Sequence, residues 1–211
     1  MKRSASSSTE LAFALLLAFL FLIDVSIAAC YVLSTLILVL FLVHLLRGGK
    51  FPILPFFCWF FAAYIFFTLL ATVFSLDRAA SIRDNKELLI FLLIPVYLWL
   101  LDSWKRVRLS LWAVLAAALF SSLVGIFTVL RHGIVLNDRL KGFTSHWMTY
   151  SGLLMLPFIF FAVRLVLRHE KKKETAAISL ALALMLAAIA FSLTRNVWLG
   201  IAAALGLFLV F

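Results

Sequence analysis

The longest apolar block of the chain, residues 11–46, reads LAFALLLAFLFLIDVSIAACYVLSTLILVLFLVHLL. As one helix, its 36 residues would extend about 54 Å, whereas the hydrocarbon core of a bilayer is about 30 Å thick. Asp24 and Ser26 interrupt the block near its middle. We therefore predict two short membrane spans that are joined by a tight turn around residues 24–26.

The composition of the whole chain indicates the same class of protein. Hydrophobic residues make up 66% of the 211 residues, and charged residues only 13%. A soluble domain of this length carries roughly a quarter charged residues. We predict an all-α, polytopic transmembrane helix bundle that forms a single integral-membrane domain over residues 1–211. The net charge of +10 is scattered between the apolar stretches, so topology explains it and no nucleic-acid partner is expected.

Six further apolar stretches follow the first two and bring the predicted number of spans to about eight. They cover residues 52–74, 88–101, 109–130, 148–167, 176–193 and 197–211. The last stretch has 15 residues, which is short for a span of about 20 residues. We therefore expect the chain to be the amino-terminal part of a longer protein.

The distribution of basic residues predicts the orientation of these spans. If the amino terminus is cytoplasmic, 12 of the 19 lysines and arginines fall on the cytoplasmic side and 7 on the outer side. Cytoplasmic loops carry the excess of positive charge in membrane proteins. A single span over residues 11–46 would move the basic residues of 47–50, 105–108 and 168–173 to the outer side. The split model keeps these clusters in the cytoplasm.

Two polar stretches on the predicted outer side contain the candidate site residues. Residues 139–152 read RLKGFTSHWMTYSG, and residues 191–200 read FSLTRNVWLG. Positive charge on the translocated side opposes the usual bias, so Arg139, Lys141 and Arg195 suggest binding of an anion. The planar guanidinium of arginine can donate two hydrogen bonds to a phosphate at once. The alternative for Arg195 is that it extends to the lipid headgroups, with Trp198 as an interfacial anchor.

The remaining polar residues of these stretches have simpler explanations. His146 is a candidate acid, base or hydrogen-bond donor, because an imidazole can carry out each of these roles, but a single loop histidine is more often a surface or capping residue. Trp147 and Tyr150 are typical of an interfacial aromatic belt. Asp24 is explained most simply as a turn residue. The four histidines are dispersed, and the sequence contains no metal-binding, P-loop, dinucleotide or G-x-S-x-G motif.

Four segments together resemble the O-antigen ligase and polymerase superfamily of bacterial envelope enzymes. Two motifs are the most specific: Arg139-Leu140-Lys141-Gly142 is similar to the family's outer-side Arg-x-x-Gly motif, and Thr194-Arg195-Asn196 is similar to its later Thr/Ser-Arg motif. The hydropathy order of residues 13–42, 74–97, 139–156 and 191–200 agrees with the family over most of the chain.

The resemblance implies a multi-pass glycosyltransferase of the bacterial inner membrane. Such an enzyme moves a glycan from undecaprenyl pyrophosphate to lipid A–core at the periplasmic face, without a cofactor or a metal. By this resemblance Arg139 and Arg195 contact the pyrophosphate, and Lys141 contributes less. The family's proposed general base, a histidine of a large periplasmic loop, has no counterpart here, and its role is not transferred to His146. The alternatives are a polymerase that extends a lipid-linked glycan, and a non-catalytic lipid transporter or scaffold.

Overall fold

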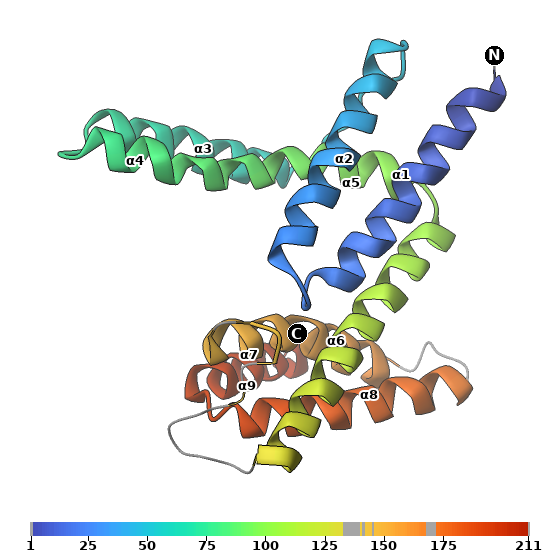
Figure 1. Ribbon diagram of the computed structural model, residues 1–211, viewed down its shortest axis with the longest axis vertical. Helices are drawn as coiled ribbons and strands as arrows, with labels where there is room; N and C mark the ends of the chain where they lie inside the picture. The colour runs from blue at the N-terminus through green and yellow to red at the C-terminus, as the bar shows by residue number, and fades with distance from the viewer. Residues whose placement is uncertain (1, 133–139, 141, 145, 168–171, 211) are drawn as a thin grey trace. The chain divides into compact units, whose positions relative to one another are not determined.

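The structure is a computed structural model that describes residues 2–132, 140, 142–144, 146–167 and 172–210 (Figure 1). All the regular secondary structure within these ranges is helical, which confirms the predicted all-α class. In chain order the helices are α1 (Lys2–Leu22), α2 (Ile27–Leu46), α3 (Cys58–Val73), α4 (Arg78–Asp84), the 3-10 helix η1 (Asn85–Leu92), α5 (Leu93–Leu100), α6 (Trp104–His132), α7 (Trp147–Val166), α8 (Lys172–Phe191) and α9 (Arg195–Val210).

The apolar block of residues 11–46 breaks where the sequence predicts. Helix α1 ends at Leu22, whose carbonyl oxygen accepts hydrogen bonds from the backbone N–H groups of Val25 and Ser26, both at 2.9 Å. The Ser26 hydroxyl oxygen then accepts from the N–H of Ala29 at 3.3 Å and caps the start of α2. Serine is a favoured residue at a helix start because its oxygen satisfies a backbone donor that has no partner within the helix. The predicted turn around residues 24–26 is confirmed.

Four of the described helices are long and apolar enough to cross a membrane. They cover Ile27–Leu46, Trp104–Arg131, Trp147–Val166 and Lys172–Phe191, with 20, 28, 20 and 20 residues. Three shorter apolar helices cover Ser8–Leu22, Cys58–Val73 and Arg195–Val210. The length and composition of the four long helices indicate a membrane protein.

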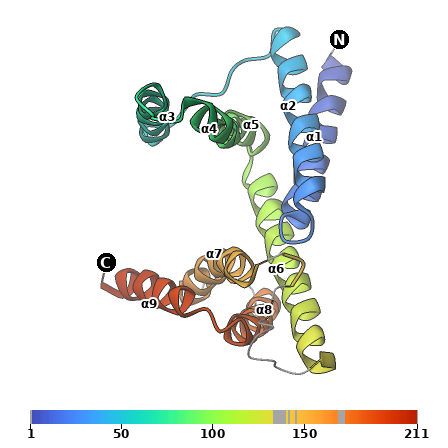
Figure 2. The same cartoon turned by 60° about the vertical axis from the view of Figure 1, so that its left-hand side comes forward.

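The contacts within the chain divide it into two compact units. The first unit comprises Met1–Leu16 and Val32–Arg108. Within it, α3 lies alongside α4 and η1, as both views show (Figure 1 and Figure 2). Arg106 is held firmly in this unit, because its guanidinium pairs with Glu10 at 2.6 Å and with Asp102 at 3.2 Å. The same guanidinium also lies over the Phe13 ring, 5.2 Å from its centre.

The second unit comprises Leu17–Tyr31 and Leu109–Phe211 and contains a continuous apolar core. Helix α7 packs against both α8 and α9, and α6 completes the core (Figure 2). The buried residues of this core are Leu115, Ala118, Leu140, Tyr150, Leu154, Phe158, Phe161, Ile178, Ala181, Leu182, Met185, Ala188, Ile189, Val197 and Ile201. The two described candidate site residues, His146 and Arg195, both lie at the starts of helices that bound this core.

Candidate functional site

The structure describes two of the four candidate site residues. Arg139 and Lys141 lie outside the described residues. His146 immediately precedes α7, and Arg195 is the first residue of α9. The described part of the site consists of the starts of these two helices and of the residues that hold them in place.

The turn between α8 and α9 is fixed by buried hydroxyl groups. The Ser192 hydroxyl donates to the carbonyl oxygen of Ile189 at 2.7 Å, and its oxygen lies 3.1 Å from the Thr194 hydroxyl. Leu193 adopts a φ of 53°, a left-handed conformation that non-glycine residues seldom adopt. Ser192 and Thr194 are both buried. The hydroxyls of this turn thus form hydrogen bonds inside the protein. Helix α9 begins directly afterwards, at Arg195.

Arg195 itself is exposed. Among the described residues no hydrogen bond or ion pair engages its guanidinium, in contrast to the paired Arg106. It stands at the start of a helix, where unsatisfied N–H groups and the helix dipole favour an anion. An exposed guanidinium at a helix start can bind a phosphate group.

His146 has a clear structural role at the start of α7. Its Nδ1 atom accepts a hydrogen bond from the N–H of Met148 at 3.3 Å, and its ring stacks on that of Trp147 with the centres 4.1 Å apart. The Thr144 hydroxyl donates to the backbone oxygen of His146 at 2.9 Å. Because Nδ1 accepts, the proton of the neutral ring is assigned to Nε2. The structure therefore shows the capping alternative that the sequence left open, with Nε2 as the atom available to a ligand.

Helices α7 and α9 are in direct contact. A Cβ atom added at Gly200 would lie 2.8 Å from the Met155 sulfur atom, so the absence of a side chain permits this approach. Arg195 lies about one and a half turns before the contact along α9, and His146 lies about two and a half turns before it along α7. No interaction between His146 and Arg195 is present in the described residues, so the structure brings their helices together without joining the two side chains.

Tyr150 is not an interfacial anchor, and that prediction is wrong. Its side chain is 1% exposed and belongs to the core of the second unit. The Tyr150 hydroxyl donates to the backbone oxygen of Ser121 at 3.1 Å, and the Tyr150 ring packs directly against Gly142, whose φ is +54°. Glycine is required at such a position because a Cβ atom would meet the ring and because the left-handed conformation disfavours other residues. A glycine near an aromatic residue was the only sequence signal for this packing.

Asp24 lies in the predicted turn, but its side chain is buried. It is 5% exposed, and among the described residues no hydrogen bond or ion pair reaches its carboxylate. Burial raises the pKa of Asp24 to about 6, because the charged form loses its hydration. Its charge also interacts with the Tyr150 hydroxyl. The signal in the sequence was that Asp24 is the only acidic residue of the apolar block 11–46.

Two buried hydroxyls lie on the helix that contacts Tyr150. The side-chain oxygens of Ser121 and Ser122 have no hydrogen-bond partner in the described part of the chain. Buried polar groups without partners are uncommon in folded proteins. Within the same ranges, no three His, Cys, Asp or Glu side chains lie close enough together to hold a metal ion. Among the described residues, the carboxylate of Asp24 and the hydroxyls of Ser121 and Ser122 are therefore buried in the second unit without a hydrogen-bond partner.

Comparison with known proteins found no match to this chain among family models, curated proteins or solved structures.

Proposed function

We propose that this chain is part of an O-antigen ligase-like glycosyltransferase of the bacterial inner membrane. It moves a glycan from undecaprenyl pyrophosphate to lipid A–core at the periplasmic face. The observation that carries the proposal is the state of Arg195, which is exposed, lies at a helix start and has no partner among the described residues. The resemblance of Thr194-Arg195-Asn196 to the family motif supports the same residue.

The chemistry requires a group that stabilises negative charge on the donor. When the bond between the anomeric carbon and the pyrophosphate oxygen breaks, the pyrophosphate leaves with the bonding electrons. The acceptor hydroxyl oxygen forms the new bond to the anomeric carbon, and the hydroxyl proton is released to water. Hydrogen-bond donors placed at the developing charge lower the barrier of such a step. Arg195 supplies a bidentate donor for this charge, and Arg139 and Lys141 are proposed to assist it. We assign His146 to donor or acceptor binding through Nε2, because its Nδ1 is used to cap α7.

This function requires the start of α9 to face the periplasm. We propose about eight spans with a cytoplasmic amino terminus, in which the shorter helices α1, α3, α5 and α9 join the four long ones. The charge count of 12 against 7 supports this orientation. A cysteine placed at the exposed Asn196, with Cys30 and Cys58 replaced by alanine, should react with a membrane-impermeant maleimide in spheroplasts. Reaction only after membrane lysis would contradict the orientation.

Glycan transfer in proteoliposomes tests the role of Arg195. The donor is an undecaprenyl-pyrophosphate glycan, and lipid A–core or a second lipid-linked repeat is supplied in separate reactions as the acceptor. We expect Arg195→Ala to lower the transfer rate by at least about a hundredfold. The transfer rate of Arg195→Lys should lie between those of Arg195→Ala and the parent. Lysine retains the positive charge but lacks the planar guanidinium that donates two hydrogen bonds at once. Consumption of the lipid-linked repeat in place of lipid A–core would show a polymerase.

Lys173→Ala is the matched control for this assay. Lys173 is also an exposed cation of the second unit, but it lies at the start of α8. The end of α8 that precedes Arg195 is about 30 Å away along the helix. The control should transfer glycan at the parental rate. Equal rates for Arg195→Ala and Lys173→Ala would overturn the assignment of Arg195.

A further inference from the structure

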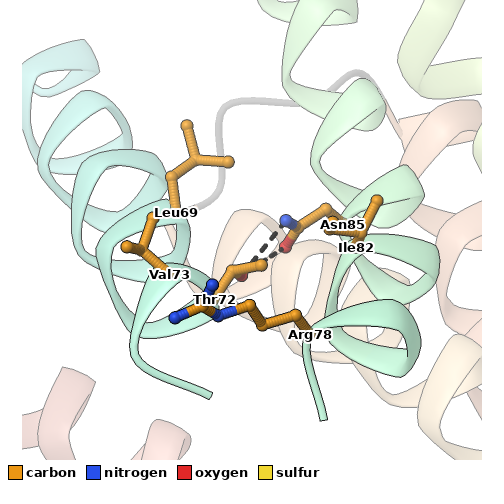
Figure 3. A pocket seen from close by; sticks show the side chains of 6 residues that line it. All are labelled: Leu69, Thr72, Val73, Arg78, Ile82 and Asn85. Atoms are coloured by element: carbon orange, nitrogen blue, oxygen red, sulfur yellow. Dashed lines mark hydrogen bonds between the residues drawn. The ribbon is translucent and has the colours of Figure 1, made fainter. Parts of the chain in front are cut away.

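The first unit contains a cavity between α3 and the segment formed by α4 and η1. Its volume is about 330 Å³, which is near the lower limit of the range of about 300–1,000 Å³ typical of small-ligand sites. The cavity is lined by Leu69, Thr72, Val73, Arg78, Ile82 and Asn85 (Figure 3). Three of the six lining residues are apolar and three are polar, so the cavity has the character of a site for an amphipathic molecule.

The polar wall presents hydrogen-bond donors. The Asn85 side-chain nitrogen donates to the Thr72 hydroxyl oxygen at 3.1 Å, and the Thr72 hydroxyl donates to the Thr68 carbonyl oxygen at 2.9 Å. A hydroxyl has only one proton, and the Thr68 oxygen is nearer to it than the Asn85 amide oxygen, at 3.3 Å. One N–H of the Asn85 amide therefore remains for a ligand, and it selects a hydrogen-bond acceptor.

Arg78 places a positive charge beside this amide. Its side chain extends from the start of α4 toward α3 (Figure 3). The neighbouring carboxylate of Asp77 accepts from the backbone N–H of Ala80 at 3.0 Å, and no ion pair with Arg78 is formed. Among the described residues the guanidinium has no partner, so it is available to an anion. A planar guanidinium matches the oxygens of a phosphate group.

The apolar wall indicates what is attached to the phosphate. Helix α3 has no buried residue among its 16, although it is rich in aromatic and aliphatic side chains. Around the cavity, Leu69 is 47% exposed and Ile82 is 64% exposed. Contiguous exposed apolar surface of this kind marks contact with lipid or with a partner. A cation and an amide next to exposed aliphatic side chains fit a phosphate that carries an acyl chain.

We propose that this cavity binds the phosphate headgroup of an anionic membrane lipid. Arg78 and the Asn85 amide hold the phosphate oxygens, and Leu69, Val73 and Ile82 contact the first part of the acyl chain. The site belongs to the first unit and does not depend on glycan transfer by the second, so binding and transfer are separate measurements.

The test compares two arginines of the same short helix. The protein in phosphatidylcholine nanodiscs is titrated with phosphatidic acid, and bound lipid is counted by native mass spectrometry. Arg78→Gln should weaken phosphatidic acid binding by at least about tenfold. Arg83→Gln is the control, because Arg83 is also exposed and also lies in α4 but does not line the cavity. Both variants lose one charge, so nonspecific attraction to this basic chain changes equally.

Further variants and probes separate the remaining outcomes. Ile82→Asp changes an exposed side chain of the apolar wall, and it should also weaken binding by at least about tenfold because it repels the phosphate. This variant decides the matter if Arg78→Gln does not fold. Equal binding by Arg78→Gln and Arg83→Gln, or by Ile82→Asp and the parent, would overturn the proposal. Inorganic phosphate should not compete at concentrations equal to the lipid, and competition at equal concentration would overturn the assignment to a lipid.

Discussion

Two short turns of the second unit each have a charged residue within them or directly after them, and they place it in opposite environments. The turn between α1 and α2 buries Asp24, whereas the turn between α8 and α9 exposes Arg195. Both turns connect apolar helices through only a few residues, so neither length nor composition separates them. The difference shows that the residues packed around a turn decide whether its charge is an electrostatic cost or a group available to a ligand.

Different hydrogen bonds produce this difference. In the second turn, the buried hydroxyls of Ser192 and Thr194 form hydrogen bonds with each other and with nearby backbone carbonyl oxygens. The charged side chain of Arg195 remains exposed. In the first turn, the Leu22 carbonyl oxygen accepts two backbone N–H groups, and among the described residues nothing pairs with the Asp24 carboxylate. An unpaired buried carboxylate costs free energy, since its pKa shifts toward the neutral form.

A large loss of stability is expected from Gly142→Ala, which disturbs the packing around Tyr150, the residue that interacts with Asp24. The added Cβ meets the buried Tyr150 ring, and φ is +54°. The left-handed conformation costs about 1–2 kcal/mol and overpacking about 1–3 kcal/mol. The free energy of unfolding should therefore fall by about 2–5 kcal/mol, measured by circular dichroism in detergent. Gly152→Ala in α7 meets no described atom within 4 Å and should not destabilise. An equal loss in both variants would contradict this packing.

The second prediction concerns Asp24→Asn, which removes the buried charge. The pKa of the Asp24 carboxyl is 3.8 when it is exposed to water, as in the unfolded chain, and about 6 when it is buried in the folded protein. Between these two pH values the folded state therefore binds more protons than the unfolded state. Stability consequently falls as the pH rises from about 4 to about 6, and stays low above it. The shift corresponds to about 3 kcal/mol at most. Asp24→Asn should be more stable than the parent by up to that amount at pH 7 and equal to it at pH 4.

The pH dependence of unfolding in detergent checks this sign. Tyr150 and Cys30 are the titratable groups that interact with Asp24 in the described part of the chain, and the variant leaves both in place. Asp84→Asn, in which the replaced carboxylate is exposed, should change the free energy of unfolding by less than about 0.5 kcal/mol. A parental protein whose stability rises between pH 4 and pH 6, with no change in Asp24→Asn, would contradict the burial of a free carboxylate.

Tyr150→Phe is expected to have a smaller effect. It removes the hydrogen bond to the Ser121 carbonyl oxygen and retains the ring that packs against Gly142. The free energy of unfolding should fall by about 1 kcal/mol, the typical contribution of one hydrogen bond. Tyr150→Ala, which also removes the ring, should cost about 3–5 kcal/mol as a large core truncation. Equal losses for the two variants would show that the ring does not fill the core.

The smallest change in stability is expected from Arg195→Ala. The side chain is exposed and has no partner among the described residues, so its removal should alter the free energy of unfolding by less than about 0.5 kcal/mol. The same thermal unfolding measurement checks this. A loss of about 2 kcal/mol or more would show that the guanidinium has a structural partner, and it would remove the contrast between the two turns.

The sequence predicts much of the fold because hydrophobic length and turn residues are local signals. The break at Asp24 to Ser26 and the helices of the second unit lie close to their predicted positions, within a few residues at each end. The stretch 88–101 is less regular than expected, since it begins within the 3-10 helix η1 and becomes α-helical only at Leu93. Hydropathy does not distinguish these two helical forms.

The interior of the site could not be predicted, because it depends on contacts between distant residues. The burial of Tyr150 requires Gly142 and the Ser121 carbonyl oxygen, which is 29 residues away in the chain. The environment of Asp24 likewise depends on a distant residue, Tyr150 of α7. The capping role of His146 was foreseen as an alternative, because a histidine that precedes an apolar helix can satisfy a free N–H.

Glycan transfer by Arg195→Ala and Asp24→Asn, measured side by side in proteoliposomes at equal amounts of folded protein, tests the central claim most directly. The exposed charge is proposed to bind the donor, and the buried charge is not. We predict that Arg195→Ala loses at least about a hundredfold in transfer rate with unchanged stability, while Asp24→Asn transfers glycan at close to the parental rate. Transfer by Arg195→Ala at the parental rate would contradict the account.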